Sequence, residues 1–300
     1  MILVGVDAGA SHSTAFVSDG ALKLLARASG APGAIRPGAV RETAGAVLDT
    51  VRRALADAGA KRATILVVGA AGAGREPERA DLERALLATG VADRVHVTTD
   101  IEIALVAAFG EGPGILLLAG TGSGACARLP GGPIRRTGGH GWQFGDEGSG
   151  YALARAALAA VSRASDGRGP RTALTEVLEK AAGLGTADAL LQWARGASRT
   201  AVAELASKVQ QGALDGDALA QQLVEDAARD LTAHLAPLRS HFPTGSPVPV
   251  ALAGGLVGAG MPVRQAVLRG LQRDPGYSLL DELVEPPRGA LRLGQRLLFH

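Results

Sequence analysis

Four times along the chain, a short run of apolar residues gives way abruptly to a turn of glycine, alanine, serine and threonine. Continuous apolar runs bounded by glycine are typical of strands buried on both faces. The four runs, each followed by its turn, are 2–6 before 7–14, 65–68 before 69–74, 115–118 before 119–124, and 248–252 before 253–258. We therefore predict four buried strands that each end in a glycine-rich loop.

Between these runs, Leu, Val and Ala recur at the three-to-four spacing of an amphipathic helix. The predicted helices are 41–58, 79–89, 101–109, 150–162, 171–182, 200–211, 218–234 and 262–271. Strands that alternate with helices predict an α/β fold. The segment 109–114, rich in glycine and proline, breaks a helix and is the expected boundary between two halves.

Composition narrows the class of protein. The 300 residues are 47% hydrophobic and 20% charged, which fits one large or two medium domains and excludes global disorder. Its 42 glycines have no three-residue period, so the chain is not collagen-like. With 31 basic and 29 acidic residues interspersed, the charge pattern argues against a nucleic-acid partner.

The sequence also bears on location and cysteine chemistry. Cys126 is the only cysteine, which excludes an intrachain disulfide and an all-cysteine metal site. The N-terminus lacks the basic region of a signal peptide and reaches Asp7 after six residues. No apolar run approaches the roughly 20 residues of a membrane-spanning helix. We expect a cytoplasmic protein with no membrane partner.

Glycine-rich loops let backbone N–H groups gather around an anion, and two facing loops could hold the β and γ phosphates of a nucleotide. Any one such loop is more often an ordinary strand-to-helix turn, but four together favour phosphate binding. Other nucleotide signatures are missing, because the chain has no Gly-Lys dipeptide and no dinucleotide fingerprint after its first strand.

Two aspartates lie where predicted strands end. Asp7 stands at the start of the first glycine turn. One interpretation is that it holds Mg²⁺ through water, because an acid beside a phosphate would otherwise repel it. The other is that it forms a turn or caps a helix. Asp100 lies where a strand gives way to a helix. It could be the helix N-cap, a carboxylate that accepts a proton from a hydroxyl nucleophile, or both.

The loop 138–150 combines several glycines with His140, Trp142, Asp146 and Glu147. The two acids could merely cap the helix that follows. A carbohydrate site fits better, since it needs carboxylates for hydroxyl groups and an aromatic surface.

Taken in order, the segments 5–14, 114–123, 138–150, 250–255 and 286–298 resemble the two phosphate motifs, the distinctive loop, the adenosine motif and the closing helix of one family. The chain resembles the BadF/BadG/BcrA/BcrD ATPase family. Within it, the chain is similar to the N-acetylglucosamine and glucosamine kinases of the actin, Hsp70 and sugar-kinase superfamily.

That resemblance implies an α/β fold of two ribonuclease-H-like (actin-like ATPase) domains, with ATP and sugar in an interdomain cleft. The first domain would be 1–110 joined by the C-terminal helix 288–300, and the second 111–287. The implied activity is transfer of the γ-phosphate of ATP to the 6-hydroxyl of a hexosamine, with Mg²⁺ as cofactor. A homodimer is only a general prior for soluble enzymes.

The resemblance also implies residue roles. Asp100 would be the catalytic base, and Asp7 would hold Mg²⁺ through water. The implied ATP-binding residues are Gly9, Ser11, Ser13, Thr14, Gly120, Thr121, Gly122, Gly254 and Gly255. Besides Asp100, the implied sugar-binding residues are Ser123, Gly124, Gly139, His140, Gly141 and Asp146.

The chain departs from the kinases at positions that bear on the sugar. His140 stands where some members have a sugar-facing tryptophan, and the segment 33–35 and Gly124 lack the asparagines that those kinases often carry. The acceptor could therefore be N-acetylglucosamine, glucosamine, glucose or another sugar. One alternative function is a dehydratase-activating ATPase, which needs more cysteines for its iron–sulfur cluster than the single Cys126. The other is a non-catalytic sugar-binding protein, which would not need both acids and both phosphate loops.

Overall fold

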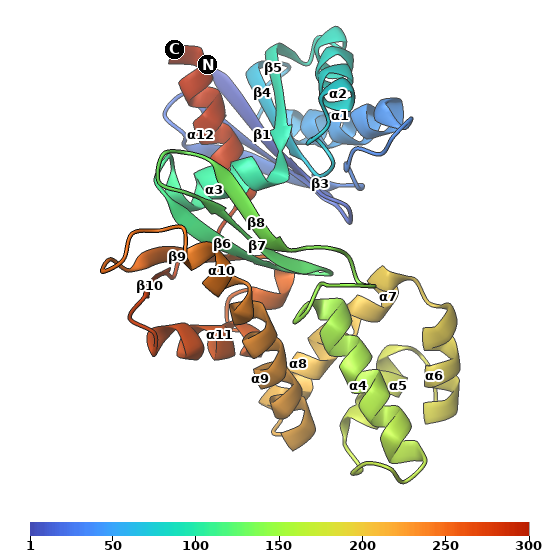
Figure 1. Cartoon of the computed structure of the whole chain (residues 1–300). Coiled ribbons are helices and arrows are strands. Elements are labelled where there is room, and N and C mark those ends of the chain that lie inside the picture. Colours follow the sequence, from blue (N-terminus) through green and yellow to red (C-terminus); the bar gives the residue numbers. More distant parts are fainter. Residues whose placement is uncertain (300) are drawn as a thin grey trace. The chain divides into compact units, whose positions relative to one another are not determined.

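The computed structural model describes residues 1–299, so residue 300, the last of the range 288–300, lies outside the described residues. The chain divides into two compact units (Figure 1). Unit 1 consists of Met1–Gly112 and the chain from Val284 onward, and unit 2 of Pro113–Leu283. Among the described residues each unit is built on one five-stranded mixed sheet, which confirms the α/β class.

The sheet of unit 1 has the order β3-β2-β1-β4-β5, with β2 antiparallel and β4 parallel to the central β1. Its strands are β1 (Ile2–Ala8), β2 (Ser13–Asp19), β3 (Leu24–Gly30), β4 (Ala63–Ala70) and β5 (Ala92–Thr99). Its helices are α1 (Val40–Asp57), α2 (Glu76–Ala88), α3 (Asp100–Phe109) and α12 (Pro286–Phe299).

The central strand β1 is buried on both faces, as its unbroken apolar run predicts. Val4 and Val6 pack in one hydrophobic cluster, which includes residues of α1 and α2. Leu3, whose side chain points the opposite way along the strand, packs in a second cluster with Ile103 of α3 and Leu291 of α12. The closing helix therefore completes the core of the unit that contains the N-terminus.

The sheet of unit 2 has the order β10-β9-β6-β7-β8 and repeats the pairing of unit 1, with a hairpin partner on one side of β6 and a parallel strand on the other. Its strands are β6 (Gly114–Ala119), β7 (Ser123–Arg128), β8 (Ile134–Gly138), β9 (Val248–Ala253) and β10 (Tyr277–Leu280). The four predicted strands are confirmed as parts of β1, β4, β6 and β9. Their first and third glycine turns, however, are β-hairpin turns rather than strand-to-helix turns.

In unit 2, the helices α4 to α10 lie between β8 and β9 in the chain. The short helix η1 (Gly255–Val257) and the helix α11 lie between β9 and β10. The predicted helix 200–211 is wrong as a single element, because it divides at Leu205 into α7 and α8. Helices α6 and α10 are missing from the prediction. The helices are α4 (Gly150–Ser165), α5 (Leu174–Ala181), α6 (Ala187–Gly196), α7 (Arg199–Glu204), α8 (Ala206–Leu214), α9 (Ala218–Ala233), α10 (Leu235–Arg239) and α11 (Pro262–Gln272).

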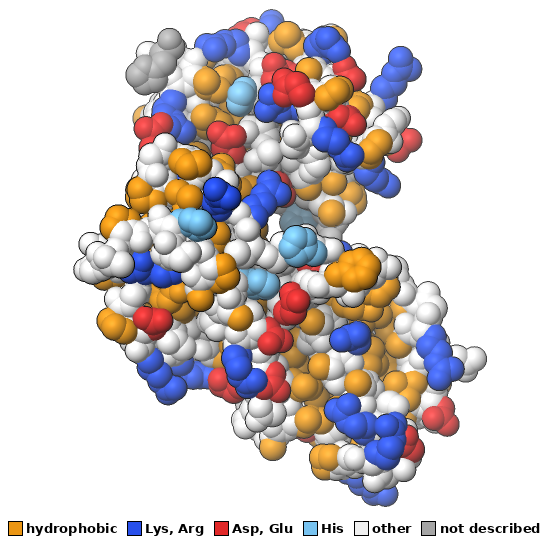
Figure 2. Space-filling view, in the orientation of Figure 1, with side chains coloured by type: hydrophobic (Ala, Val, Ile, Leu, Met, Phe, Trp, Pro, Cys, Tyr) orange, Lys and Arg blue, Asp and Glu red, His pale blue; other side chains and the backbone are white. Residues whose placement is uncertain are grey.

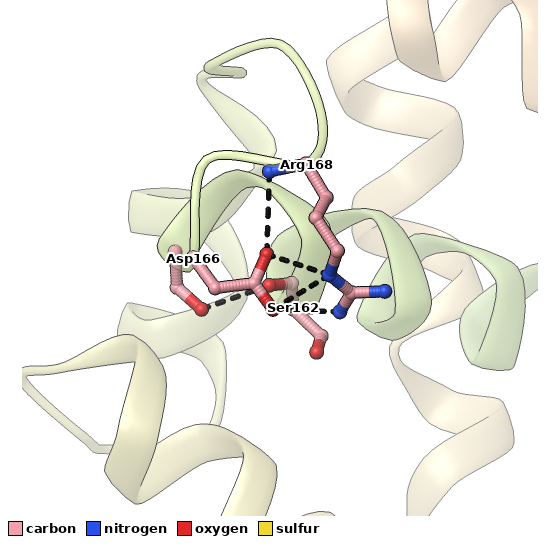
Figure 3. Close-up of polar contacts among 4 residues, drawn as sticks. Ser162, Asp166 and Arg168 are labelled. Carbon is pink, nitrogen blue, oxygen red and sulfur yellow. Dashed lines mark hydrogen bonds and ion pairs between the residues drawn. The ribbon is translucent and has the colours of Figure 1, made fainter.

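Helix α4 ends in a polar turn (Figure 3). The Arg168 guanidinium donates to the Asp166 carboxylate, from Nε at 2.8 Å and from Nη2 at 2.6 Å, and its hydrogen bonds lower the pKa of Asp166. The Ser165 hydroxyl donates to the backbone oxygen of Ser162 at 2.9 Å. These groups lie in solvent, so they shape the helix end and contribute little to stability.

The surface carries charged side chains of both signs. On the face shown in Figure 2, basic and acidic side chains are interspersed over both units. None of the helices in residues 1–299 combines the length and apolar character needed to cross a membrane.

Candidate functional site

The first glycine loop is the turn of the β1–β2 hairpin. The N–H of Gly9 donates across the turn to the oxygen of His12 at 3.0 Å. The oxygen of Gly9 accepts from the N–H groups of Gly33 at 3.0 Å and Ala34 at 3.2 Å. Ser11 lies exposed at the tip. The loop is thus fixed by backbone bonds while its tip stays open to an anion.

The two predicted ATP-binding residues that follow this loop, Ser13 and Thr14, have different surroundings. Ser13 is fully buried at the start of β2, and its hydroxyl has no hydrogen-bond partner among the described residues. A side chain added at Gly33 would approach that hydroxyl to 2.5 Å, so Ser13 faces the packed interior instead of the loop surface. Thr14 is half-buried and pairs directly with Asp7 across the hairpin.

Asp7 lies inside β1, one residue before its end. It is opposite Thr14 on β2 and in register with Gly69 on β4, so these positions share one face of the sheet. Burial, together with the negative charge of Asp100, raises the pKa of the Asp7 carboxyl to about 7. The aspartate is therefore neither a turn former nor a helix cap.

Asp100 is the first residue of α3, at the carboxyl end of β5. The N-cap is Thr99, whose hydroxyl accepts from the N–H of Glu102 at 3.1 Å. One carboxylate oxygen of Asp100 accepts from the N–H of Ile101 at 3.0 Å, and the side chain is half-buried. Because Thr99 caps the helix, Asp100 is left available for chemistry.

The acid pair of unit 1 has the character of a cation site. Among the described residues, no basic side chain forms an ion pair with Asp7 or Asp100. Nor do the described residues gather three His, Cys, Asp or Glu side chains into a direct metal cage. Uncompensated carboxylates with few direct ligands suit Mg²⁺, which keeps most of its waters.

The second glycine loop, Gly120–Gly122, is the turn of the β6–β7 hairpin. The N–H of Gly120 donates to the oxygen of Gly122 at 2.9 Å. Its oxygen accepts from the N–H of Gly150 at 2.8 Å, and the oxygen of Thr121 accepts from the N–H of Tyr151 at 3.4 Å. The loop is thereby attached to the first turn of α4.

The predicted adenosine motif lies beside this loop. Strands β6 and β9 are parallel, and Leu118 pairs with Ala253 near the ends of both. Gly254 has a φ of +108°, and a side chain there would collide with the backbone oxygen of Ala119. Only glycine allows the two backbones to come this close. Gly254 and Gly255 are exposed.

Asp146 is the most constrained residue of the loop 138–150. It has a φ of +59°, rare for a residue other than glycine, and only 4% of its surface is exposed. Its carboxylate accepts from the N–H of Ser123 at 3.3 Å and pairs with the guanidinium of Arg199. The cap of α4 is Ser149, which accepts from the N–H of Ala152 at 3.1 Å. Capping therefore does not explain Asp146.

The predicted sugar residues other than Asp100 lie in the same unit as Asp146, and Ser123 contacts it. Ser123 is buried and donates its hydroxyl to the backbone oxygen of Glu147 at 2.5 Å. A side chain at Gly124 would approach the N–H of Gly139 to 3.0 Å, so β7 and the loop pack closely. His140 is exposed, and Gly141 has a φ of +89°.

Trp142 and Phe144 are the exposed aromatic side chains of this loop, and Trp142 is the one whose ring contacts another. It is 47% exposed, and its ring meets that of Tyr151 edge to face at 5.5 Å between centroids. One ring is therefore held in place while much of its surface remains open.

Sequence reasoning missed Arg199. It begins α7 and is 53 residues from its partner Asp146. One local signal could have identified it: the first turn of a helix favours acidic residues, so an arginine directly after the cap Ser198 is out of place.

The chain is similar to known proteins over most of its length. The model of the BadF/BadG/BcrA/BcrD ATPase family matches residues 4–294. An N-acetylmuramic acid/N-acetylglucosamine kinase of Clostridium acetobutylicum is 27% identical over 76% of this chain and 76% of its own. An N-acetyl-D-glucosamine kinase of Dictyostelium discoideum is also 27% identical, over 77% of this chain and 76% of its own.

Solved structures confirm the fold. A candidate N-acetylglucosamine kinase from Chromobacterium violaceum superposes with a TM-score of 0.80 at 29% identity, covering 97% of this chain and 98% of its own. A glucokinase of the ROK family from Streptomyces griseus, solved with glucose and AMPPNP, gives a TM-score of 0.67 at 19% identity, covering 99% of this chain and 100% of its own.

Proposed function

Since the chain belongs to the BadF/BadG/BcrA/BcrD ATPase family, we propose that this protein is a sugar kinase that transfers the γ-phosphate of ATP to the 6-hydroxyl of a hexosamine. The observation that carries the proposal is the acid pair of unit 1, Asp7 and Asp100, at the carboxyl ends of β1 and β5 beside a glycine hairpin loop. The relatives named as amino-sugar kinases support a hexosamine as the acceptor.

In this proposal the glycine loops hold ATP. Ser11 and Thr121, at the tips of the two hairpin turns, contact its phosphates together with the backbone N–H groups around them. Gly254 and Gly255 lie against the adenosine, where the absence of side chains leaves room for it. Ser13 faces the interior of unit 1, so we assign the contribution of that strand to Thr14.

Asp100 acts on the acceptor hydroxyl. The hydroxyl oxygen attacks the γ-phosphorus, the bond from that phosphorus to the oxygen bridging it to the β-phosphate breaks, and ADP leaves. The hydroxyl proton passes to the carboxylate of Asp100. Because phosphoryl transfer has a loose transition state, the proton moves late and orientation of the hydroxyl matters more than basicity.

Mg²⁺, held by Asp7 through water, would neutralise charge on the phosphate oxygens when bound. The buried carboxyl of Asp7 and its neighbour Asp100 fit this group, since a nearby cation would offset the repulsion between them. Cation binding would therefore favour the ionised form of Asp7.

Asp146 and the loop around it bind the sugar in this proposal. A buried carboxylate accepts hydrogen bonds from sugar hydroxyls, and Trp142 offers an apolar surface to the ring. The chain has no amide side chain at 33–35 or at Gly124 that would read an N-acetyl group. Free glucosamine therefore stands beside N-acetylglucosamine as a candidate acceptor.

A screen of ADP release tests the proposal. ATP and Mg²⁺ are supplied with hexoses, hexosamines and N-acetylated hexosamines, and the product of any active sugar is located by NMR. We expect ADP release that depends on a hexosamine and a phosphate on its O6. Release of ADP independent of every sugar would instead support an ATPase, and sugar binding without ADP release a binding protein.

A further inference from the structure

We propose that Arg199 is a positioning residue that orients Asp146 for the sugar and links this carboxylate to the second glycine loop. The inference rests on the proposed function, because it specifies how the sugar-binding residues of unit 2 are held. It starts from two contacts of the Arg199 side chain and one buried donor that has no partner in the described part of the chain.

The first contact is the ion pair itself. Nη2 of Arg199 donates to Oδ2 of Asp146, while Oδ1 accepts from the N–H of Ser123 at 3.3 Å. The Asp146 side chain is only 6% exposed and that of Arg199 is 35% exposed. A buried carboxylate requires such compensation, and charge-assisted hydrogen bonds are directional. Both oxygens of Asp146 are thus fixed in direction by separate donors.

The second contact joins the pair to the glycine loop. A side chain added at Gly122 would approach Nη2 of Arg199 to 2.6 Å and Oδ2 of Asp146 to 2.9 Å. No such side chain exists, so the backbone of the loop rests directly against the pair. A change in the orientation of the arginine would therefore be felt both at the sugar carboxylate and at the loop.

The third observation is a buried hydrogen-bond donor of Arg199 that has no partner within residues 1–299. Nε of Arg199 is buried and has no hydrogen-bond partner among the described residues. A buried donor without a partner costs free energy, so its retention calls for an explanation. The need to place the other end of the guanidinium against Asp146 and Gly122 supplies one.

This arrangement leads to a specific expectation for binding. Asp146 retains lone pairs for sugar hydroxyls, because each of its oxygens uses only one donor. Removal of the guanidinium would leave the carboxylate buried and oriented by the Ser123 N–H alone. Sugar affinity should then fall, and it should fall through Asp146 rather than through a general loss of structure.

The test is a double-mutant cycle on sugar affinity. Calorimetry without ATP, using the sugar that is active in the screen, measures the wild type, Arg199→Ala, Asp146→Asn and the double variant. We expect Arg199→Ala to weaken binding about tenfold or more, in the range of a lost hydrogen bond to a charged group. With Asp146→Asn already present, Arg199→Ala should add less than about threefold, since interacting residues are not additive.

Two further variants separate positioning from folding. Arg195→Ala removes an exposed arginine four residues earlier and should leave sugar affinity unchanged. Arg199→Lys keeps the charge but loses the planar guanidinium, and should recover only part of the affinity. Folding of each variant is checked by its melting temperature.

Each outcome decides the matter. Additive losses in the cycle, or sugar affinity in Arg199→Ala equal to that of wild type, would overturn the role of Arg199 while leaving the kinase intact. A wild type that binds and phosphorylates none of the sugars would overturn the proposed function, and the inference that depends on it.

Discussion

The two hairpin loops occupy the same place in sheets of the same strand order, yet they are supported differently. In unit 1 the oxygen of Gly9 is held by the backbone of Gly33 and Ala34. In unit 2 the oxygen of Gly120 is held by Gly150, at the start of α4. The carboxylates beside the loops differ more sharply, because Asp7 faces a second acid whereas Asp146 faces an arginine.

This difference assigns different chemistry to the two units. Two acids without a basic partner repel each other, which favours a cation and a proton acceptor. A carboxylate already paired with arginine is fixed in direction, which favours directed hydrogen bonds from neutral hydroxyl groups. We therefore place phosphoryl transfer at the acids of unit 1 and recognition of the sugar at Asp146.

The largest expected effect is on turnover. Asp100→Asn should reduce kcat by at least about 10²-fold, the lower range for a lost general base. The asparagine keeps the shape, and Thr99 still caps α3, so the fold should be retained. Sugar-dependent ADP release under saturating ATP measures the effect. Near-normal turnover would remove Asp100 from its role.

The next effect is on sugar affinity. Gly122→Ala should displace the Arg199–Asp146 pair and weaken sugar binding about tenfold, which corresponds to about 1.4 kcal/mol. Gly270→Ala makes the same chemical change in α11, where a side chain would meet open space, and serves as the control. Equal sugar affinity in both variants would contradict the close packing of the loop on the pair.

The acid pair should also affect stability. The folded-state pKa of Asp7, about 7, lies above its ordinary value of 3.8, so the folded state binds the proton more tightly. The tighter proton binding stabilises the folded state. This stabilisation is fully present below about pH 4 and is lost as the pH rises through 7. Asp7→Asn should therefore stabilise the protein more at pH 8 than at pH 5.

Urea unfolding of wild type and Asp7→Asn in buffer with a chelator, at the two pH values, checks this difference. Subtraction of one protein from the other removes the contributions of the remaining titratable groups. A difference between the variants that is the same at both pH values would show that Asp7 does not titrate in this range.

The smallest effect is a spectroscopic one. If Trp142 lines the sugar site, sugar addition should change the tryptophan fluorescence of wild type and of Trp193→Phe. The change should vanish in Trp142→Phe. Trp193 on α6 packs against the core of unit 2 and gives the matched control. A signal that follows Trp193 would place the sugar elsewhere.

The sequence predicted those parts of the fold that depend on local pattern. The unbroken apolar runs predicted β1, β4, β6 and β9, because strands buried on both faces are mostly apolar. Strand β7, Ser123–Arg128, was taken in part as a loop, since small residues such as Gly124 and Ala125 carry little strand signal. The β6–β7 hairpin was missed for this reason.

At the site, sequence reasoning found acids but not their surroundings. Asp7 was recognisable because it ends an apolar run, and Asp100 because it lies where a strand gives way to a helix. Which residue caps α3 could not be decided locally, since Thr99 and Asp100 are both good caps. The pairing of Asp146 with Arg199 depends on how a helical segment folds back, and no local pattern specifies it.

The division of roles between the two carboxylates can be tested by one measurement, the equilibrium affinity for the accepted sugar in Asp100→Asn and Asp146→Asn, determined by calorimetry without ATP. We predict that Asp146→Asn weakens binding about tenfold or more, while Asp100→Asn changes it less than about threefold. Loss of affinity in Asp100→Asn together with normal affinity in Asp146→Asn would contradict the account.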